Sequence, residues 1–359
     1  MKKLLALLLA ISLTVSLAAC GTKDNTSKEE PKTSVEEKEE ESKEEVPEES
    51  SGPAYPMPSS KATISTGSGN SGGTVFTYMS GAASLLNSTI DNFELVVEST
   101  AGSFANMTLL KNGDVDISQI EVGLAYDYYT GNGVDAAETF EDLRVISPMY
   151  VSQWFIVTLD SSITKLEDLN GKTIGAGSAN SAADIYDRMF VEFFDIDCTI
   201  VNEGWGDCFE DMYDGSIDVV MGCTGQPSSP VVELETKTDV YLLQMTDEEI
   251  DKWLEAYPQF SPSVIENGAY KCVDADGYKS FGSWSMLCTT ADFDESLGYW
   301  IAKTILDNND YMLNVHSAAK DSICENITDQ PMAIHKGALA YYKEAGIEIP
   351  DALIGSEAK

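Results

Sequence analysis

The chain has 359 residues, of which 60 are acidic and 22 basic, and its formal net charge at neutral pH is −38. This excess of negative charge makes nucleic acids and anionic membrane surfaces poor partners. The length leaves room for two lobes with their own cores after an N-terminal segment is set aside.

The N-terminal segment predicts export. Two lysines follow Met1, and the apolar run 4–17 is too short to span a membrane comfortably, which indicates a signal peptide over residues 1–19. Leu17-Ala18-Ala19-Cys20 resembles a lipobox, so we expect lipidation at Cys20. The protein would then be extracytoplasmic and attached to the cell membrane by its lipid. An ordinary cleaved signal with a chance cysteine is the alternative.

The following stretch, residues 20–60, carries the lipidated cysteine and then consists largely of Lys, Glu, Ser, Thr and Pro. Such a composition cannot bury enough apolar surface to offset the loss of chain entropy. We therefore expect a disordered, acidic tether between the membrane anchor and the folded part.

Beyond the tether, short apolar strands alternate with amphipathic stretches, which predicts an α/β fold. In chain order we expect a strand over 62–66, a helix over 74–86, a strand over 93–98, a helix over 104–112, a strand over 116–120 and a helix over 123–129. The long extended run 143–159 is typical of a strand that crosses between lobes. The order then repeats with helix 182–194, strand 199–201, helix 208–214 and strand 217–221. Strand 240–243, a capped helix after Thr246, a recrossing strand over 281–290 and helices over 294–306 and 331–345 complete the pattern.

Two elbows rich in glycine and serine, residues 67–74 and 175–182, each lead from a strand into a helix. Each offers small side chains and uncapped backbone N–H groups at a helix N-terminus, a site that attracts negative charge or a polar ligand head. If the two elbows face each other, they form a clamp around a ligand. A third polar elbow, 99–103, has Ser103 as its expected N-cap.

The first elbow also matches two enzyme patterns. Residues 67–72 fit G-x-G-x-x-G with Glu94 near the place of a ribose-binding acid, but reduced dinucleotides are scarce outside the cytoplasm. Residues 69–73 fit the G-x-S-x-G nucleophile elbow, with His316 and His335 downstream. An exported, lipid-anchored serine hydrolase is therefore an alternative, although only tether lies upstream to supply an oxyanion donor. Tight turns without a ligand also explain either elbow.

The cysteines leave disulfide formation undecided, and the histidines give little support for a metal site. The six cysteines after Cys20 form no Cys-x-x-Cys pair, so they permit either disulfides or buried free thiols: Cys198, Cys208, Cys223, Cys272, Cys288 and Cys324. Two histidines without H-E-x-x-H argue against a catalytic metal. We expect no metal and no cofactor.

Several motifs together resemble one family. They are residues 64–74, 97–103, 109–116, 119–126 and 331–338, followed by Tyr341-Tyr342 and Glu344-Ala345-Gly346. Over residues 62–349 the chain resembles the TAXI-family solute-binding receptors of tripartite ATP-independent periplasmic (TRAP) transporters. The resemblance implies a two-lobed type II periplasmic-binding-protein fold with a hinge of two crossing strands and no enzyme activity. It also implies a monomer that passes a small solute, such as glutamate, glutamine or a related organic acid, to permease subunits in the membrane.

In this arrangement lobe 1 comprises residues 62–150 plus 288–359, and lobe 2 comprises residues 151–287. The expected ligand contacts in lobe 1 are Gly69, Asn70, Ser71, Gly72, Gly73, Thr74, Ser103 and Gln119, and those in lobe 2 are Ser178, Asn180, Ser181 and Ala182. Candidate walls are Phe76, Tyr126, Trp154 and Trp205. Asn70-Ser71 interrupts the glycine-rich start that is usual in the family, so one contact is expected to differ.

An arginine is not expected to bind an anionic ligand here. The sequence has two arginines, Arg144 and Arg188, and neither lies on an elbow. Unless Arg188 turns inward, a carboxylate would depend on helix N-termini and hydroxyl groups. The negative charge of the chain favours a zwitterion or a polar neutral solute.

Overall fold

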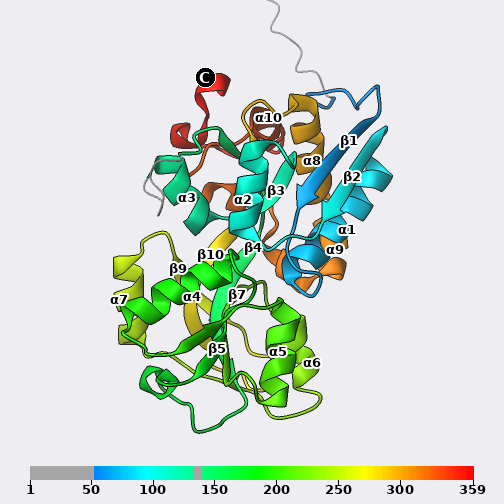
Figure 1. The fold of residues 1–359 in the computed structure, drawn as a ribbon. Coiled ribbons are helices and arrows are strands. Elements are labelled where there is room, and N and C mark those ends of the chain that lie inside the picture. The colour runs from blue at the N-terminus through cyan, green and yellow to red at the C-terminus, as the bar shows by residue number, and fades with distance from the viewer. Residues whose placement is uncertain (1–51, 132–138) are drawn as a thin grey trace, which may run out of the picture. The chain divides into compact units, whose positions relative to one another are not determined.

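The computed structural model describes residues 52–131 and 139–359. They belong to one compact unit, Gly52–Lys359, in which two lobes share a ten-stranded sheet (Figure 1). The predicted signal peptide, Cys20 and most of the predicted tether lie outside the described residues. Over the described ranges, none of the helices combines the length and apolarity that crossing a bilayer requires.

Lobe 1 is built on three parallel strands followed by the two strands that cross between the lobes. Its strand order is β2-β1-β3-β10-β4. The three parallel strands are β1 (Ala62–Gly67), β2 (Phe93–Glu98) and β3 (Ile117–Glu121). Its helices are α1 (Thr74–Thr89), α2 (Ser103–Asn112), α3 (Val122–Thr130), α8 (Glu295–Asp307), α9 (Asn309–Val315) and α10 (Lys336–Glu344).

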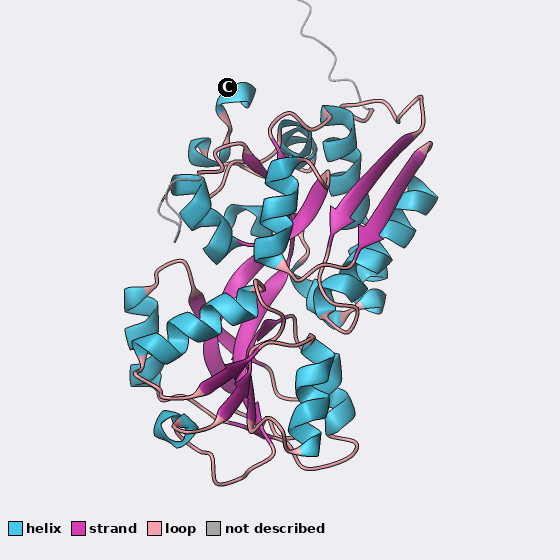
Figure 2. Cartoon of the chain, in the orientation of Figure 1, coloured by secondary structure: helices cyan, strands magenta, loops and turns pink. Residues whose placement is uncertain are grey.

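Lobe 2 repeats this order as β6-β5-β7-β4-β10. Its own strands are β5 (Thr173–Gly175), β6 (Thr199–Val201) and β7 (Val219–Thr224), with the short β8 (Tyr241–Leu242) and β9 (Ser261–Ile265) added at the crossing strands. Its helices are α4 (Ala182–Phe193), α5 (Trp205–Asp214), α6 (Ser229–Leu234) and α7 (Asp247–Ala256), and Figure 2 shows them flanking the strands. In both lobes the first strand lies between the second and the third.

The two crossing strands are β4 (Leu143–Thr158) and β10 (Tyr278–Thr290), which pair antiparallel. Their register shifts between Ser285 and Met286, where the sheet passes from one lobe to the other. A register shift of this kind raises the local twist of a strand pair. With the repeated strand order, these two shared strands confirm the predicted α/β, two-lobed type II periplasmic-binding-protein fold with its hinge.

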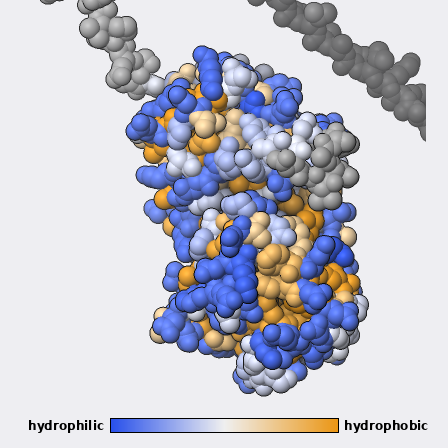
Figure 3. Space-filling model, turned by 90° about the vertical axis from the view of Figure 1, so that its left-hand side faces the viewer, coloured by the Kyte–Doolittle hydropathy of each residue, from blue (hydrophilic) through white to orange (hydrophobic). Residues whose placement is uncertain are grey.

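Each lobe has its own apolar core. One apolar cluster fills lobe 1 and includes Tyr150 and Met286, whereas two clusters lie in lobe 2. Trp154 and Ile156 belong to one lobe 2 cluster and Phe155 to the other, because successive side chains of a strand point to opposite faces of a sheet. The change of core in β4 therefore falls between residues 150 and 154. Figure 3 shows a largely hydrophilic surface with apolar side chains gathered over part of lobe 2.

Two segments differ from the predictions. The stretch 54–58, expected to be tether, lies on lobe 1: the Trp300 indole N–H donates to the Pro56 carbonyl over 3.0 Å, and the Tyr55 hydroxyl donates to Glu295. The last predicted helix, 331–345, begins only at Lys336, because Ile334 pairs with Val145 as an isolated bridge. Three elements were not among the predictions: α6, α9 and β9.

Candidate functional site

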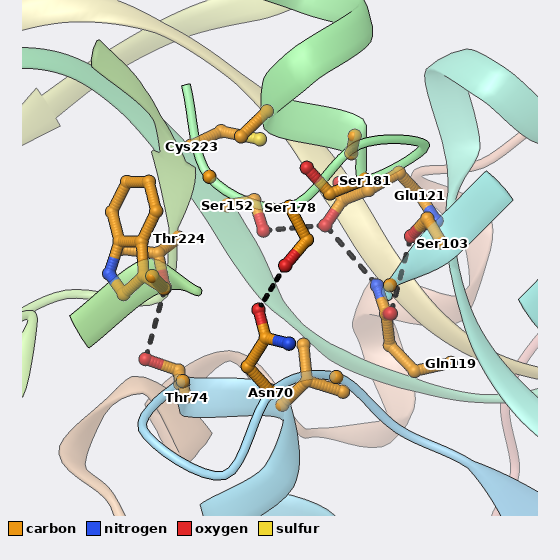
Figure 4. Close-up of a pocket in the computed structure, with 18 of the residues that line it drawn as sticks. Asn70, Thr74, Ser103, Gln119, Glu121, Ser152, Ser178, Ser181, Cys223 and Thr224 are labelled. Carbon is orange, nitrogen blue, oxygen red and sulfur yellow. Dashed lines mark hydrogen bonds between the residues drawn. The ribbon is translucent and has the colours of Figure 1, made fainter. Parts of the chain in front are cut away.

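A cavity of about 80 Å³ lies between the lobes, where the loops that follow β1, β5 and β7 meet the N-termini of α1, α2 and α4 (Figure 4). Its lining comes from both lobes and from β4. The lining residues are Gly69, Asn70, Gly73, Thr74, Val75, Ala101, Gly102, Ser103, Gln119, Glu121, Tyr150, Ser152, Gly177, Ser178, Ser181, Ala182, Ala183, Trp205, Cys223 and Thr224. A polar cavity at the junction of two lobes is a common place for a small-molecule site.

Direct contacts between the lobes close this cavity. The Ser178 hydroxyl of lobe 2 donates to Asn70 Oδ1 of lobe 1 over 2.8 Å, as Figure 4 shows. The Thr74 hydroxyl donates to the Gly225 carbonyl over 3.0 Å and accepts from the Thr224 hydroxyl over 3.1 Å. These bonds describe a closed arrangement of the two lobes.

Gly102 allows the same closure at a second point. A Cβ on this residue would lie 3.2 Å from the Ser181 Cβ, and its φ of +119° is one that side-chain-bearing residues rarely adopt. Glycine at this position therefore lets the α2 N-terminus approach the α4 N-terminus closely.

The helix N-termini of lobe 1 are not satisfied by their own side chains. Gly73 caps α1 and Gly102 caps α2, neither with a side-chain hydrogen bond, and neither helix has an acid in its first turn. The first N–H groups of a helix have no acceptor within the helix, and the helix dipole adds partial positive charge there. This end of the cavity is therefore suited to an anionic group.

The helix N-terminus of lobe 2 is different, because α4 supplies its own acceptors. The Ser181 hydroxyl caps α4 by accepting from the Asp184 N–H over 3.1 Å, and Asp184 Oδ2 accepts from the Asn180 N–H over 3.1 Å. Arg188 Nε donates to Asp184 over 2.7 Å, so this arginine does not turn toward the cavity. The positive end of α4 is thus largely compensated within lobe 2.

Glu121 places a carboxyl group inside the cavity. It ends β3 and precedes α3, and it is only 3% exposed. Oε1 accepts from the Ser152 hydroxyl over 2.6 Å and from Gln119 Nε2 over 3.3 Å, and Figure 4 shows the carboxyl group between these two side chains. Burial raises the pKa of Glu121 to about 8, although the hydroxyl groups of Ser152 and Ser283 oppose the rise.

Two polar atoms of residues that line the cavity lack partners. Among the described residues, Glu121 Oε2 and the Tyr150 hydroxyl have no hydrogen-bond partner, and Tyr150 is fully buried. Six other buried side-chain atoms of the described residues also lack partners, but none of them belongs to a residue that lines the cavity. Buried polar groups are nearly always paired, so a ligand that reaches these two atoms would supply the missing partners.

The structure brings ten of the expected ligand contacts to this cavity: Gly69, Asn70, Gly73, Thr74, Ser103, Gln119, Ser178, Ser181, Ala182 and Trp205. Ser103 occupies the first turn of α2 and not the predicted cap position, which Gly102 takes. From α2 its hydroxyl donates to Gln119 Oε1 over 3.2 Å and accepts from the Glu121 N–H over 3.0 Å. The ends of α2 and β3 are joined in this way.

Six expected contacts lie elsewhere. Ser71, Gly72 and Asn180 are exposed, and Phe76 is half-buried on α1. Tyr126 lines a separate hollow beside α3. Trp154 is a correction to the predicted wall, because its side chain is fully buried in the lobe 2 core, stacks on Phe281 and donates to Asp187 over 2.8 Å.

The sequence analysis missed Glu121, Tyr150 and Ser152. A usable signal existed for each of them. Glu121 directly follows a predicted strand, at the strand end where the elbows also begin. Tyr150 and Ser152 are two residues apart on the crossing strand, so they share a face, and Ser152 is a polar residue within a buried run.

The enzyme alternatives are not assembled. Ser71, the nucleophile of the hydrolase alternative, is exposed, whereas His335 is buried in lobe 1 with Nε2 3.0 Å from the Phe293 carbonyl oxygen. His316 Nδ1 accepts from the Ala318 N–H over 3.1 Å, and neither histidine lines the cavity. Glu94 pairs with Lys61 at the surface and not with the first elbow.

The cysteines that the sequence left open are all free thiols in the described part of the chain. Cys223 lines the cavity, and burial raises the pKa of its thiol well above the usual value. Cys208 and Cys288 are buried as small apolar side chains, whereas Cys272 is exposed.

The sequence model of the NMT1-like family matches residues 64–346, so the chain belongs to this family. Solved structures of other proteins are similar to this chain at low sequence identity. One described as a periplasmic transporter is 13% identical with a TM-score of 0.48, covering 79% of this chain and 92% of that one. A structure from work on glutathione import through GshT and the cystine importer TcyBC of Streptococcus mutans is 10% identical with a TM-score of 0.47, covering 73% and 97%. The L-arginine-bound AbpA of Streptococcus pneumoniae is 14% identical with a TM-score of 0.43, covering 73% and 96%.

Proposed function

We propose that this protein is an extracytoplasmic solute-binding protein of the TAXI type, anchored through a lipid on Cys20. It captures a small polar or carboxylate-bearing solute, such as glutamate, glutamine or a related organic acid, and passes it to a TRAP-type permease. The observation that carries the proposal is the closed cavity between two lobes joined by two crossing strands. Its lining includes helix N-termini and hydroxyl groups that can hold a polar guest.

Binding by such a site needs no covalent step. The lobes would open at the register shift in β10, admit the solute and close again through the Asn70–Ser178 and Thr74–Gly225 contacts. A solute that contacts both lobes binds the closed state better than the open one and so shifts the population toward closure. No observation favours the serine hydrolase alternative, because the exposed Ser71 has no histidine in the cavity beside it.

A thermal-shift screen tests this function. The protein used is residues 52–359, which form one compact unit with its own cores, and the probes are amino acids, small organic acids and polar neutral solutes. A solute at 100 times its dissociation constant should raise the free energy of unfolding by about 2.7 kcal/mol. Absence of any response across the library would contradict solute capture.

Delivery to a permease requires its own test. Membranes that contain the candidate permease subunits should take up a labelled solute only when the solute-loaded protein is added. Uptake at the same rate without the protein would contradict the delivery step and leave capture standing.

A further inference from the structure

Glu121 Oε2 is a buried carboxyl oxygen without a hydrogen-bond partner, in a cavity that several hydroxyl groups also line. The residue is 3% exposed, and Oε1 accepts from Ser152 and Gln119 whereas Oε2 has no hydrogen-bond partner. The surrounding hydroxyl groups and uncapped N–H groups of α1 and α2 donate hydrogen bonds. A buried carboxyl oxygen without a donor costs free energy, so the closed cavity is complementary to a guest that supplies one.

The chain does not supply a cation to this carboxyl group. None of the residues that line the cavity is a lysine or an arginine. Arg144 is occupied by Glu357 at the far side of lobe 1, and Arg188 by Asp184. A positive charge opposite Glu121 would therefore have to come from the guest.

The volume of the cavity limits the guest to a small molecule. One water needs about 10–15 Å³ on the same measure of volume. The cavity of about 80 Å³ exceeds this minimum several-fold and therefore favours a small guest over a large one.

We propose that the solute is a small zwitterion whose protonated amine donates to Glu121 Oε2 and the Tyr150 hydroxyl, while its carboxylate binds at the N-termini of α1 and α2. This inference rests on the proposed function and specifies its substrate class. Glu121 is the residue that selects for the amine, because it is the one carboxylic acid that lines the cavity. Both contacts lie within lobe 1 or on β4, so lobe 2 mainly closes the site.

Proton release should accompany binding if Glu121 is protonated in the empty closed cavity, as its pKa of about 8 indicates. The titratable groups around it are Tyr150 on β4, Tyr186 on α4 and Cys223 on β7, and burial raises the pKa of each well above its usual value. Among these groups, only Glu121 changes charge near neutral pH. Affinity for an amine should therefore rise as pH increases toward 8.

The experiment compares matched probes by calorimetry on residues 52–359. One set is L-alanine, propionate and ethylamine, and the other is L-glutamate, glutarate and 4-aminobutyrate. We expect at least one of the two amino acids to bind, and its deaminated acid to bind at least 30-fold more weakly. Glu121→Gln keeps the shape of the side chain but removes its charge, so it should weaken amino-acid binding by about 30-fold or more.

Two further variants keep the test decisive. Glu192→Gln changes an exposed acid on α4 and should leave affinity unchanged. If Glu121→Gln does not fold, as judged by thermal unfolding, Tyr150→Phe replaces it, and this variant should weaken the amino acid by about 3- to 10-fold through one lost hydrogen bond without weakening the deaminated acid.

Other outcomes overturn the inference in distinguishable ways. Equal binding of the amino acid and its deaminated acid, or an unchanged affinity in Glu121→Gln, would contradict the amine subsite and leave solute capture intact. The amine subsite would also be contradicted, with solute capture intact, if neither amino acid binds while another solute in the wider library raises the unfolding temperature. If no solute in the library raises the unfolding temperature, both the amine subsite and solute capture are contradicted.

Discussion

The two lobes present similar elbows in the sequence, but the structure uses them differently. In lobe 1, Gly73 and Gly102 leave the N-termini of α1 and α2 without side-chain acceptors. In lobe 2, Ser181 caps α4 and Asp184 adds a carboxylate to the same turn. A glycine cap leaves the anion site for a guest, whereas a serine cap with a nearby acid fills that site from within the chain.

The buried acids of the two lobes show the same division. Glu121 of lobe 1 lines the cavity and has one unpaired carboxyl oxygen, whereas Asp187 of lobe 2 lies in the aromatic core. Asp187 Oδ1 accepts from the Trp154 indole, and burial raises the pKa of this carboxyl well above its usual value. Asp187 Oδ2 also lacks a hydrogen-bond partner. The contrast is therefore one of place: the unpaired carboxyl oxygen of lobe 1 belongs to a residue that lines the cavity, whereas that of lobe 2 belongs to a residue of the core.

The largest expected effect is on the lobe 2 core. Trp154 is fully buried and stacks on Phe281, with ring centroids 4.9 Å apart. Trp154→Ala should therefore lower the free energy of unfolding by about 3–5 kcal/mol, measured by denaturant titration. The remaining folded protein should bind its solute as before, since Trp154 does not line the cavity. A loss of affinity without a loss of stability would instead restore Trp154 as a wall of the site.

Asp187→Asn tests the second contrast through pH. Burial raises the pKa of this carboxyl well above its usual value in the folded protein, so the stability it contributes is fully present below the unfolded pKa of about 4 and is lost as pH rises through the folded pKa. The loss proceeds at up to about 1.4 kcal/mol per pH unit. Asparagine does not ionise, so the variant should gain about 1–3 kcal/mol on wild type between pH 4 and pH 6.

Denaturant titrations at several pH values measure this difference, with Glu192→Gln on the same helix as an exposed control. A difference between Asp187→Asn and wild type that does not change with pH would show that the core tolerates the ionised carboxylate.

The sequence predicted the architecture well because the fold depends on hydrophobic periodicity and on glycine-rich turns, both of which are local. The strands at 93–98 and 199–201 and the long crossing strand have nearly the predicted bounds. The cavity depends on which side of a strand faces the partner lobe, and that is fixed by tertiary packing. This is why the sequence favours Trp154 as a wall and does not single out Tyr150 on the same strand.

The elbows show the same limit of sequence reasoning. Glycine and serine content identified both of them, and ten of the expected contacts reach the cavity. Whether a helix terminus is free depends on side-chain partners such as the Ser181 cap and the carboxylate of Asp184, which composition alone does not reveal.

Gly73→Asp would convert the lobe 1 elbow into a copy of the lobe 2 elbow. The backbone at Gly73 is extended, with φ −94° and ψ 159°, so an aspartate can cap α1 there. The new carboxylate should stabilise the empty protein by a few tenths to about 1 kcal/mol and weaken a carboxylate-bearing solute by about tenfold or more. Thermal unfolding and calorimetry measure the two effects.

Gly73→Ala is the uncharged control for Gly73→Asp, because it adds a side chain at the same position without a carboxylate. Its Cβ would lie 3.3 Å from the Asn70 carbonyl oxygen. Alanine should weaken binding less than aspartate does. If both variants weaken the solute equally, the α1 N-terminus acts through shape and not as an anion site.

The smallest expected effect concerns closure itself. Asn70→Ala removes the acceptor for the Ser178 hydroxyl, a bond that the closed protein makes directly across the cleft. One such hydrogen bond contributes about 0.5–1.5 kcal/mol, so the solute should bind about 2- to 10-fold more weakly, mainly through faster dissociation. Ser178→Ala should have a similar effect, and the double variant should lose no more than the larger single effect because both remove one interaction. Additive losses would show that Asn70 and Ser178 contact the solute separately, and closure would then depend on the bonds of Thr74 to Thr224 and Gly225.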